Sequence, residues 1–534
     1  MPRFTKSSAW LPATVWTAIL AVGAVAIFAA GPAPQLIFAA DVANYLDGCH
    51  RVSLGQVLGA DFSSPIGPAA LLPCAVMMRI NGADIHALVG GSVLVWLGFG
   101  LLSWLAVGSR LPSWLAAGFA LFVAATAAAP YTLDFGSWRT LSYGLLYNRL
   151  AWSALCVAAA VALLPRRDLQ PARMVAVGLG ACAAWLWLLK PNFLLVLVPL
   201  LVCDWRRLPG EAAWFARVGI GAAGTLLVVW VLVPFAPLAY AAGHLGMAQN
   251  APADLISYTF SRSIVENVWI VAALVAIWGL TLLTSLPPGS RWRAGWTVGA
   301  IIVTTFAANL TNCSFAEFPL WGALGWIAAG VASATGTLAR ACRVAALIIG
   351  LGFTWQPLAG LGYNFLWKAV RSPGVPPSVA VAGPAWLGLP MRPVPGQASH
   401  ANGPLENPAN YALWINDGLA LVARHSLPPG PVLSLDWNNP FPFALGREPA
   451  RGDNIAWHVG RTVGPKSHPD PRVIAAEAIA IMEPKRSLQP DSLAFKRTIF
   501  AEILASSYHL AGESDQWRLW LRHPPGVSPE ANHR

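Results

Sequence analysis

Long apolar runs separated by short polar segments make up the first two-thirds of the chain. Runs of about 20 apolar residues are long enough to cross a bilayer as helices. We place spans at 10–31, 85–107, 113–129, 150–164, 173–189, 191–203, 216–235, 264–285, 294–310, 318–335 and 342–357. The pattern predicts an all-α polytopic membrane bundle with about 11 transmembrane helices.

The composition supports this class. Of the 534 residues, 56% are hydrophobic and only 11% are charged, which excludes an ordinary soluble domain. The net charge of +11 could suggest a nucleic-acid partner, but many Lys and Arg residues stand at the ends of apolar runs, where they set topology. We therefore expect membrane lipids and no nucleic acid as partners. The seven cysteines form no CxxC pair, which argues against a disulfide framework or a zinc site.

The first apolar run begins with basic residues, Arg3 and Lys6, and ends in an Ala-rich segment, as a signal peptide does. It is longer than the apolar region of a removable signal peptide. We expect it to be retained as a signal-anchor helix.

Basic residues predict the orientation. If the N-terminus is cytoplasmic, the basic residues between later spans also fall on the cytoplasmic side, as the positive-inside rule requires. These are Arg110, Arg166, Arg167, Arg173, Arg206, Arg207, Arg217, Arg291, Arg293, Arg340 and Arg343. The apolar segment 66–80 is short and holds Pro68 and Pro73, and counting it as a span would invert every later loop. We predict that it is a juxtamembrane or re-entrant helix, within a first outer loop at 32–84 that is followed by a second at 130–149. The Ala-, Arg- and Trp-rich composition is compatible with a bacterial inner membrane.

The chain changes character near residue 358, where Pro and Gly become frequent and the charge density rises. We predict a transmembrane module at 1–357 and a soluble, small C-terminal α/β domain at 358–534 on the outer, periplasmic face. Its expected elements are strands at 431–437, 478–484 and 516–523 and a helix at 492–510.

Three acids lie just after the first span, in FAADVANYLDGCHRVSLGQVLGADFSSPIGP. Asp41 comes where the chain leaves the bilayer, fixed to a helix end and partly shielded. Partial desolvation moves the pKa of a carboxyl toward neutrality and suits a general base, although an acid here can also simply mark the end of a span. We expect Asp47 to be solvated and Asp61 to lie beside a Pro-Gly turn.

The Asp-x-x-x-Tyr arrangement of Asp41 and Tyr45, followed by DF-S-P-x-GP from Asp61 to Pro68, resembles the first outer loop of GT-C fold glycosyltransferases. These membrane enzymes use polyprenyl-phosphate-linked sugars and include oligosaccharyltransferases, protein O-mannosyltransferases and aminoarabinose transferases. The resemblance covers most of residues 1–357 in layout but only about thirty residues in motif.

The resemblance implies a hexosyl or pentosyl transfer with inversion. It implies that Asp41 is the catalytic base or a metal ligand, and that Asp134 is a second catalytic acid. Asp134 stands alone in TLDFGSWR, without the two-acid motif of some members, and could instead be solvated or paired with Arg139. One carboxylate per loop offers a divalent metal few ligands, so such a cofactor is possible but is not implied.

A departing polyprenyl phosphate carries negative charge that Lys or Arg can stabilise. The candidates at the outer face are Lys190, Arg149, Arg139 and Arg262. Lys190 lies in the short apolar turn LLKPN, where it could also extend toward headgroups, and the arginines could equally have interfacial roles. Tyr45, Asp61 and Glu317 are candidates for supporting the residues at the reaction centre.

Two further features are interpreted structurally. The lone residues His50 and His244 on outer loops are expected to be structural or solvated. The segment LDWNNPFPFALG could shape an acceptor groove, but we favour a strand that leads into a packed Pro turn.

The leading functional hypothesis is sugar transfer from a polyprenyl-phosphate donor to a lipid, glycan or protein acceptor on the outer face. A transporter or lipid-carrier flippase is the alternative. Transporters carry charges near the bilayer midplane and often show internal repeats, whereas the charges here gather at one face and no repeat is evident. An inactive relative with a structural role is a third possibility.

Overall fold

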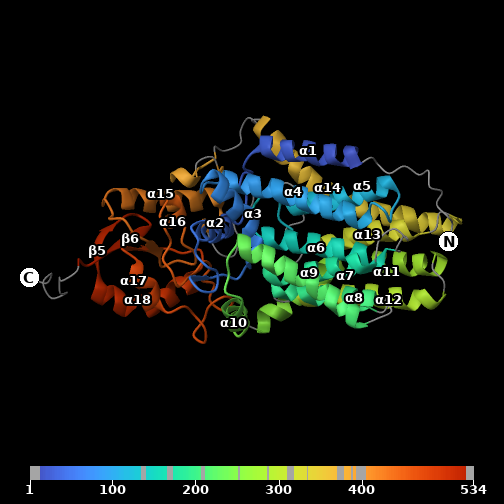
Figure 1. The fold of residues 1–534 in the computed structure, drawn as a ribbon. Coiled ribbons are helices and arrows are strands. Elements are labelled where there is room, and N and C mark those ends of the chain that lie inside the picture. The colour runs from blue at the N-terminus through green and yellow to red at the C-terminus, as the bar shows by residue number, and fades with distance from the viewer. Residues whose placement is uncertain are drawn as a thin grey trace, which may run out of the picture.

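The computed structural model describes residues 13–133, 140–164, 172–205, 211–250, 253–285, 288–309, 318–332, 335–369, 378–386, 389–392 and 404–524. A long bundle of helices carries a mixed α/β part at one end (Figure 1).

Each of the eleven predicted apolar runs forms a helix. They are α1 (Ala13–Ala30), α4 (His86–Val107), α5 (Ser113–Ala128), α6 (Leu146–Leu163), α7 (Ala172–Leu189), α8 (Leu194–Trp205), α9 (Glu211–Leu232), α11 (Ala253–Ser285), α12 (Pro288–Asn309), α13 (Pro319–Val331) and α14 (Thr337–Ala369). A short 3-10 turn, η1 (Pro191–Phe193), precedes α8. Five of the described helices, α4, α6, α9, α11 and α14, are long and apolar enough to cross a membrane by length and composition.

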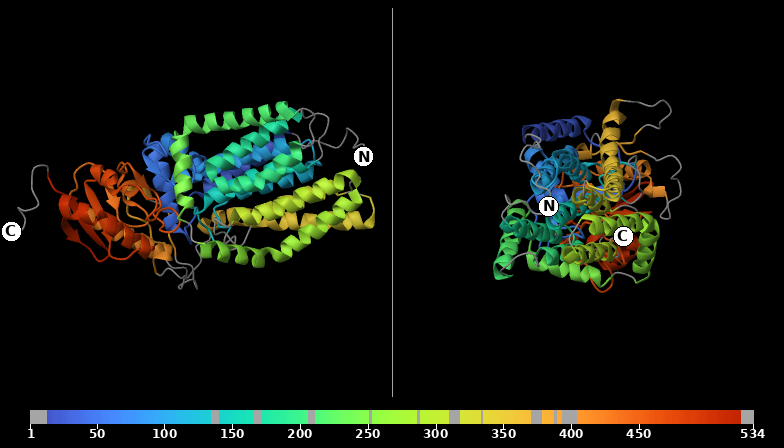
Figure 2. Two further views of the ribbon diagram at one scale, coloured as in Figure 1. Left: turned by 90° about the horizontal axis from the view of Figure 1, so that it is seen from below. Right: turned by 90° about the vertical axis from the view of Figure 1, so that its right-hand side faces the viewer.

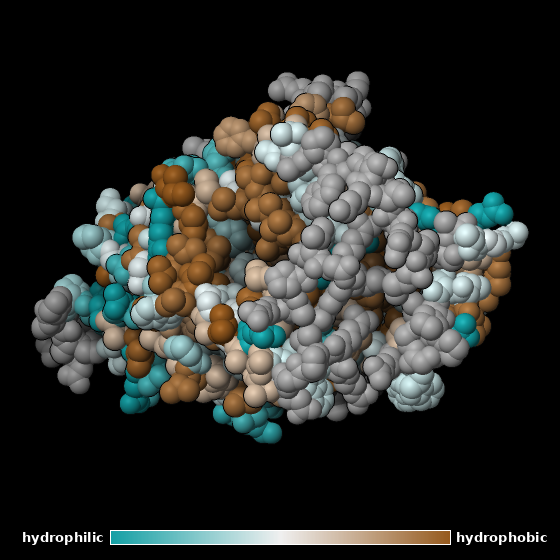
Figure 3. All heavy atoms as spheres, turned by 45° about the vertical axis from the view of Figure 1, so that its right-hand side comes forward, coloured by the Kyte–Doolittle hydropathy of each residue, from teal (hydrophilic) through white to brown (hydrophobic). Residues whose placement is uncertain are grey.

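Many apolar side chains of the bundle face outward. Trp269 on α11, for example, is 83% exposed, and Figure 3 shows apolar residues covering broad areas of the surface. Such a surface would be unfavourable in water and suits contact with lipid. The helix α14 continues through Pro357 to Ala369, beyond the predicted end of the last span.

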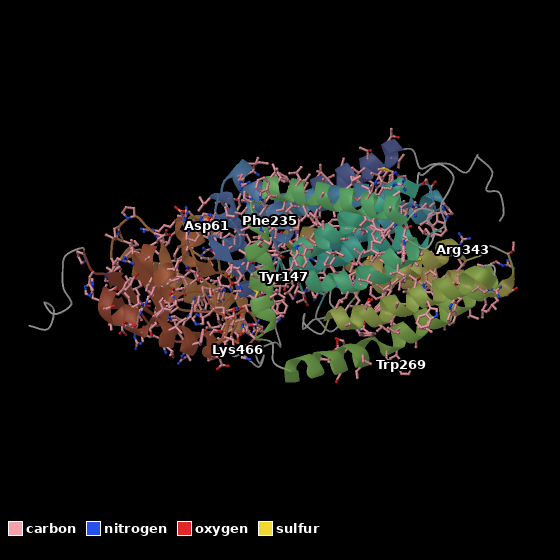
Figure 4. All side chains as sticks on the ribbon, turned by 60° about the horizontal axis from the view of Figure 1, so that its bottom comes forward. Asp61, Tyr147, Phe235, Trp269, Arg343 and Lys466 are labelled. Carbon is pink, nitrogen blue, oxygen red and sulfur yellow. The ribbon has the colours of Figure 1, made fainter. Side chains whose placement is uncertain are left out.

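Successive helices of the bundle alternate in direction, so basic residues meet at the end far from the C-terminal part. Arg110, after α4, donates through Nη1 to the carbonyl oxygen of Val161 near the end of α6 at 2.6 Å. Arg343, near the start of α14, lies at this far end, and α1 also begins there (Figures 1 and 4).

The first outer loop folds into two helices, α2 (Ala39–Ser53) and α3 (Pro68–Asn81), with the short strand β1 (Phe62–Ser63) between them. The helix α3 is the segment that the sequence predicts as juxtamembrane, and both helices lie between the bundle and the C-terminal part (Figure 1). A third short helix, α10 (Pro237–Ala248), also stands between these two parts (Figures 1 and 2).

The C-terminal part contains a four-stranded sheet of order β2-β4-β6-β5. Its strands are β2 (Val432–Ser434), β4 (Ala480–Pro484), β5 (Tyr508–Glu513) and β6 (Trp517–Arg522), and only β2 and β4 pair in parallel. Its helices are α15 (Pro408–Ala423), α16 (Phe441–Leu445), α17 (Pro471–Glu477) and α18 (Pro490–Ser507), with 3-10 turns η2 (Pro384–Trp386) and η3 (Pro404–Glu406). The three predicted strands and the helix are confirmed, but the helix ends at Ser507 and β5 begins at once.

The C-terminal part is joined to the first outer loop by backbone pairing. The strand β1 pairs in parallel with β3 (Asp453–Asn454), and Ile455 N donates to the carbonyl oxygen of Ser63. Buried apolar residues of α2, such as Leu46, share one core with buried residues of the C-terminal part, such as Phe443. The first outer loop and the C-terminal part thus share backbone pairing and one apolar core. The helix α2 is therefore fixed by contacts with the C-terminal part as well as with the bundle.

Candidate functional site

Two strained helix starts touch at the end of the bundle. Phe38 precedes α2 with φ 55° and Leu145 precedes α6 with φ 58°, both in the left-handed region. The two starts lie close together, because a Cβ added at Gly144 would be 2.8 Å from Cβ of Phe38. Bulky residues rarely adopt this conformation, and such strain is concentrated at functional sites.

Asp41 lies in the first turn of α2 and is half-buried. The helix N-terminus favours a negative charge at this position. Asn438, from the segment before α16, donates through Nδ2 to the carbonyl oxygen of Ala40 at 3.1 Å and to the hydroxyl oxygen of Tyr411 at 2.7 Å. Two side chains from the C-terminal part therefore lie against the start of the helix that carries Asp41.

Tyr411 is sensitive to nearby charge. Burial raises its pKa well above the ordinary value, and the charges of Asp436 and Asp41 raise it further. Since the phenol oxygen accepts from Asn438, its own proton is available to a second acceptor. Sequence reasoning missed both Tyr411 and Asn438. The only signal was the segment WNNP, which we interpreted as a packed turn.

Tyr45 lies one turn after Asp41 and is buried. Its hydroxyl donates to the carbonyl oxygen of Ala70 at 3.0 Å and so ties α2 to α3. Burial raises the pKa of Tyr45, while the positive charge of Arg149 lowers it. Arg149 is therefore close enough to α2 for its positive charge to affect the pKa of a side chain on that helix.

Arg149 occupies the first turn of α6 and is only 1% exposed. Its Nη1 donates to the carbonyl oxygen of Tyr131 and lies 3.5 Å from that of Ser142. Its Nε and Nη2 are buried and find no hydrogen-bond partner within the described ranges. A buried guanidinium with open donors is costly, and an anionic ligand would satisfy it.

Lys190 is half-buried at the end of α7. Its Nζ lies 5.2 Å from the centre of the Tyr147 ring, a cation–π contact. Tyr147 and Arg149 share the first turn of α6, so the two cations approach the same helix start. Figure 4 places Tyr147 on the side of the bundle that faces the C-terminal part.

The remaining predicted residues are distributed differently. Asp134, Arg139 and Glu317 lie outside the described residues. Arg262 is on an exposed part of α11 and forms an ion pair with Glu266 of the same helix at 2.6 Å. Asp61 accepts from the backbone N–H of Val57 at 2.8 Å and lies 3.5 Å from Nη1 of Arg451, so it closes its own turn and contacts the C-terminal part.

The expectation that Asp47 is solvated is wrong. It is 1% exposed and accepts from Nε of Arg51 at 2.9 Å, while Nη2 of Arg51 lies 3.6 Å from Oδ2 of Asp453. The reason is that this face of α2 is covered by the C-terminal part. Burial raises the pKa of Asp47 to about 6, against the opposing effect of Arg51.

A buried lysine extends this charged cluster. Nζ of Lys496 donates to the carbonyl oxygens of Ser434 and Asp436 at 2.9 and 3.0 Å and lies 4.4 Å from the centre of the Trp457 ring. Asp453 accepts from Nε1 of Trp457 at 2.7 Å. The buried charge cluster of Asp47, Arg51, Asp453, Lys496 and Asp436 thus joins the first outer loop to the C-terminal part.

No three His, Cys, Asp or Glu side chains within the described ranges are arranged to hold a metal ion. Asp134 of the second outer loop and Glu317 fall outside those ranges, so the structure does not test whether a divalent metal binds there.

Comparisons with known proteins give a limited result. No protein-family model matches the chain, and no curated protein does. The chain is similar to the crystal structure of ArnT from Cupriavidus metallidurans bound to undecaprenyl phosphate, with 15% identity and a TM-score of 0.45 over 96% of this chain and 99% of that one. The apo structure of the same protein gives 14% identity and a TM-score of 0.46, over 95% and 98%. Because identity and TM-score are low, the functional argument rests on the residues of the site.

Proposed function

We propose that the chain is a membrane glycosyltransferase of the GT-C type that transfers a sugar from a polyprenyl-phosphate donor to an acceptor on the extracytoplasmic face. One observation carries the proposal. A helix-start carboxylate, Asp41, and a buried guanidinium with open donors, Arg149, lie on two helix starts that touch each other. A base and an anion site so close together suit the displacement of a phosphate leaving group.

In the proposed reaction, Asp41 accepts the proton of an acceptor hydroxyl while that oxygen bonds to the anomeric carbon. The bond between the anomeric carbon and the phosphate oxygen breaks, and its electron pair leaves with the phosphate. Arg149 and Lys190 stabilise the charge that develops on this oxygen. A single displacement of this kind inverts the anomeric centre.

The C-terminal part contributes to this site by fixing the base. Asn438 holds the carbonyl oxygen next to Asp41, and Tyr411 places a hydroxyl within the influence of the carboxylate. Fixed geometry of this kind is what makes a general base effective. Asp134 and Arg139 remain predictions for the same site, and so does Glu317.

The bundle provides the setting for a lipid-linked donor. Its exposed apolar helices suit a membrane, and the basic residues at the far end suit a cytoplasmic location for that end. The site would then face the periplasm of a bacterial inner membrane. The acceptor is a hydroxyl-bearing lipid, glycan or protein.

The direct test uses membranes or purified protein with a radiolabelled polyprenyl-phosphate sugar. Asp41→Asn and Asp41→Ala should lower sugar transfer by about 10²–10⁴-fold, the usual contribution of a general base. Asp515→Asn, at an exposed acid in the C-terminal part, is the matched control and should transfer sugar normally.

Full transfer by both Asp41 variants would refute the role of Asp41. A reconstituted flux assay separates the transporter alternative, because a transporter would move labelled lipid carrier across the bilayer without cleaving the sugar–phosphate bond. Flux without transfer would replace the proposed function.

A further inference from the structure

Two buried cysteines meet between the helices of the first outer loop. Cys49 on α2 is 0% exposed and Cys74 on α3 is 1% exposed. The thiol of Cys74 lies within hydrogen-bonding reach of the Cys49 thiol. The Sγ atom of Cys49 also lies 3.6 Å from the carbonyl oxygen of Leu71, one turn before Cys74 on α3. Neither cysteine takes part in the proposed transfer reaction.

Hydrogen bonds on either side of the pair set the register of the two helices. One turn before Cys49, the hydroxyl of Tyr45 donates to the carbonyl oxygen of Ala70 at 3.0 Å. Near the ends of both helices, Nη2 of Arg79 donates to the carbonyl oxygen of Val52 at 2.7 Å. The helices therefore run side by side in the same direction, next to each other in Figure 1, and the cysteine pair lies between these two contacts.

The backbone of α3 is also fixed from its other side. At Gly91 of α4, an added Cβ would lie 3.2 Å from the backbone N of Cys74 and 3.3 Å from the carbonyl carbon of Pro73, so α4 packs directly on the backbone of α3. Both cysteines belong to the main apolar core. Packing on both sides therefore keeps the two thiols next to each other.

The positions of the other cysteines distinguish this pair. Four lie within helices of the bundle, namely Cys156, Cys182, Cys203 and Cys342. Cys313 lies outside the described residues. Among the described cysteines, only Cys49 and Cys74 belong to an outer loop, and these two are in contact. Disulfides form and persist in oxidising compartments such as the bacterial periplasm, which the first outer loop faces in the proposed orientation.

Metal binding is another use of paired thiols. A structural zinc site needs four ligands. Within the described ranges, no third His, Cys, Asp or Glu joins the pair in an arrangement that could hold a metal ion. The hydroxyl of Tyr45 lies beside the Cys49 thiol, but burial raises its pKa well above the ordinary value and its proton is donated to Ala70. The surroundings of the pair therefore favour a covalent bond over a metal site.

We propose that Cys49 and Cys74 form a disulfide bond that fixes α2, the helix carrying Asp41, against α3. The inference goes beyond the proposed function and uses only the outer location of the first loop. A single bond between two packed helices differs from the framework of several bridges that the sequence argues against.

The bond forms by exchange with an oxidant of the thiol–disulfide oxidoreductase class, a carrier protein with a reactive disulfide. The thiolate of one cysteine attacks one carrier sulfur, and the other carrier sulfur leaves as a thiolate. The thiolate of the second cysteine then attacks the mixed disulfide and releases the carrier as a dithiol. Two electrons pass to the carrier, and the two thiol protons of the pair end on the carrier's sulfurs.

Burial determines when this exchange occurs. It raises the pKa of Cys49 well above the ordinary value, so the thiolate that the exchange needs is scarce in the folded protein. Both side chains are also closed to a carrier once α2 and α3 are packed. The bond therefore forms while the loop folds and is afterwards shielded from reductants. It is a structural bond and not a reversible switch.

Peptide mapping tests the bond directly. Cells that make the full-length protein are quenched in acid and denatured with N-ethylmaleimide, which caps free thiols before purification can oxidise them. The protein is digested without reductant and examined by mass spectrometry. In most molecules the Cys49 peptide should be joined to the Cys74 peptide, whereas Cys156 and Cys182 should carry maleimide. Maleimide on both Cys49 and Cys74 in most molecules would overturn the proposal, as would a bond from either of them to Cys313.

A second measurement tests whether the bond stabilises the protein. Cells grown with dithiothreitol, which keeps the outer compartment reducing, supply wild-type protein with the pair as thiols. Its thermal midpoint should be at least about 2 °C below that of the oxidised protein, because the unfolded chain is no longer cross-linked. The double variant Cys49→Ala, Cys74→Ala has no bond to lose, so its midpoint should be the same from both growth conditions. Equal midpoints for oxidised and reduced wild type would refute the stabilising role of the bond.

These outcomes are separate from those of the transfer assay. A mapped bond in a protein whose Asp41 variants transfer sugar normally leaves the disulfide standing and refutes only the role of Asp41. Free thiols at both positions in an enzyme that depends on Asp41 refute only the disulfide.

Discussion

Nδ2 of Asn438 donates a hydrogen bond to the carbonyl oxygen of Ala40 at 3.1 Å, across 398 positions of sequence. The C-terminal part therefore reaches the residue before the proposed base. A role for the C-terminal part in positioning the proposed base therefore becomes testable.

The neighbouring asparagines offer a matched comparison. Asn439 is also buried, but its Nδ2 donates to the carbonyl oxygen of Val432 within the C-terminal part. We expect Asn438→Ala to lower kcat by roughly ten- to a hundredfold with little change in the KM of the donor, because a small displacement of a base is costly. Asn439→Ala should destabilise the protein to a similar extent but leave kcat close to normal. Equal loss of kcat in both variants would assign Asn438 a structural role only.

Arg149 should show a trade-off between stability and activity. Its open donors make it costly in the free protein, so Arg149→Met should leave the thermal midpoint unchanged or raise it. The same change should lower sugar transfer by about 10²–10³-fold, because the leaving phosphate loses a directed charge. Differential scanning fluorimetry and the transfer assay are compared on one preparation. A lower midpoint together with lower activity would contradict an anion-binding role.

Lys190 should act as a point charge. Lys190→Arg keeps the charge and the contact with the Tyr147 ring, whereas Lys190→Gln removes both. We expect Lys190→Gln to raise the KM for the donor or lower kcat by roughly tenfold, and Lys190→Arg to recover most of this effect. Lys466→Gln, at an exposed lysine of the C-terminal part, is the control. If the kinetic constants of Lys190→Gln equal those of Lys190→Arg, a role for the positive charge is excluded.

The burial of Asp47 predicts a pH-dependent stability. Its pKa is about 6 in the folded protein, above the ordinary value of 3.8, so the folded state binds the proton first as the pH falls. The contribution of Asp47 to the free energy of unfolding is therefore complete below about pH 4 and is lost as the pH rises through about 6.

This effect is isolated by comparing wild type with Asp47→Asn between pH 4 and 7. The stability of the wild type relative to the variant should rise as the pH falls, at no more than about 1.4 kcal/mol per pH unit. Asp491→Asn, at an exposed acid near the start of α18, should show no such trend relative to the wild type. A difference that falls with decreasing pH would mean that Asp47 is stabilised as a carboxylate.

The orientation can be tested by labelling from outside the cell. In a background without the native cysteines, Lys466→Cys should react with a membrane-impermeant maleimide in intact cells or spheroplasts. Arg340→Cys, exposed near the start of α14 at the far end of the bundle, should react only after permeabilisation. The opposite pattern would invert the proposed topology.

The sequence was informative where a local rule applies. Bilayer length predicted the eleven helices, whereas the juxtamembrane placement of α3, which follows from the positive-inside rule, stays a prediction. Short apolar runs predicted β2 and β4, and alternation predicted β6, but β5 was missed because its residues continue the amphipathic pattern of α18.

Local sequence patterns could not predict contacts between residues that are far apart in the sequence. Asp47 reads as a solvated acid until Asp453 and the C-terminal part cover it. Tyr411 stands in an ordinary helix pattern, and nothing local shows that its ring lies near Asp41.

The contact between Gly144 and Phe38 has a consequence for how such an enzyme could change its donor. Any side chain at Gly144 would collide with the residue that starts α2, so the arginine-bearing helix and the aspartate-bearing helix cannot be repositioned independently. Variation in the sugar is then expected to accumulate away from these two helix starts. The distance between the proposed base, Asp41, and the proposed phosphate ligand, Arg149, would then stay constant during evolution. The residues that select the sugar could change independently of it.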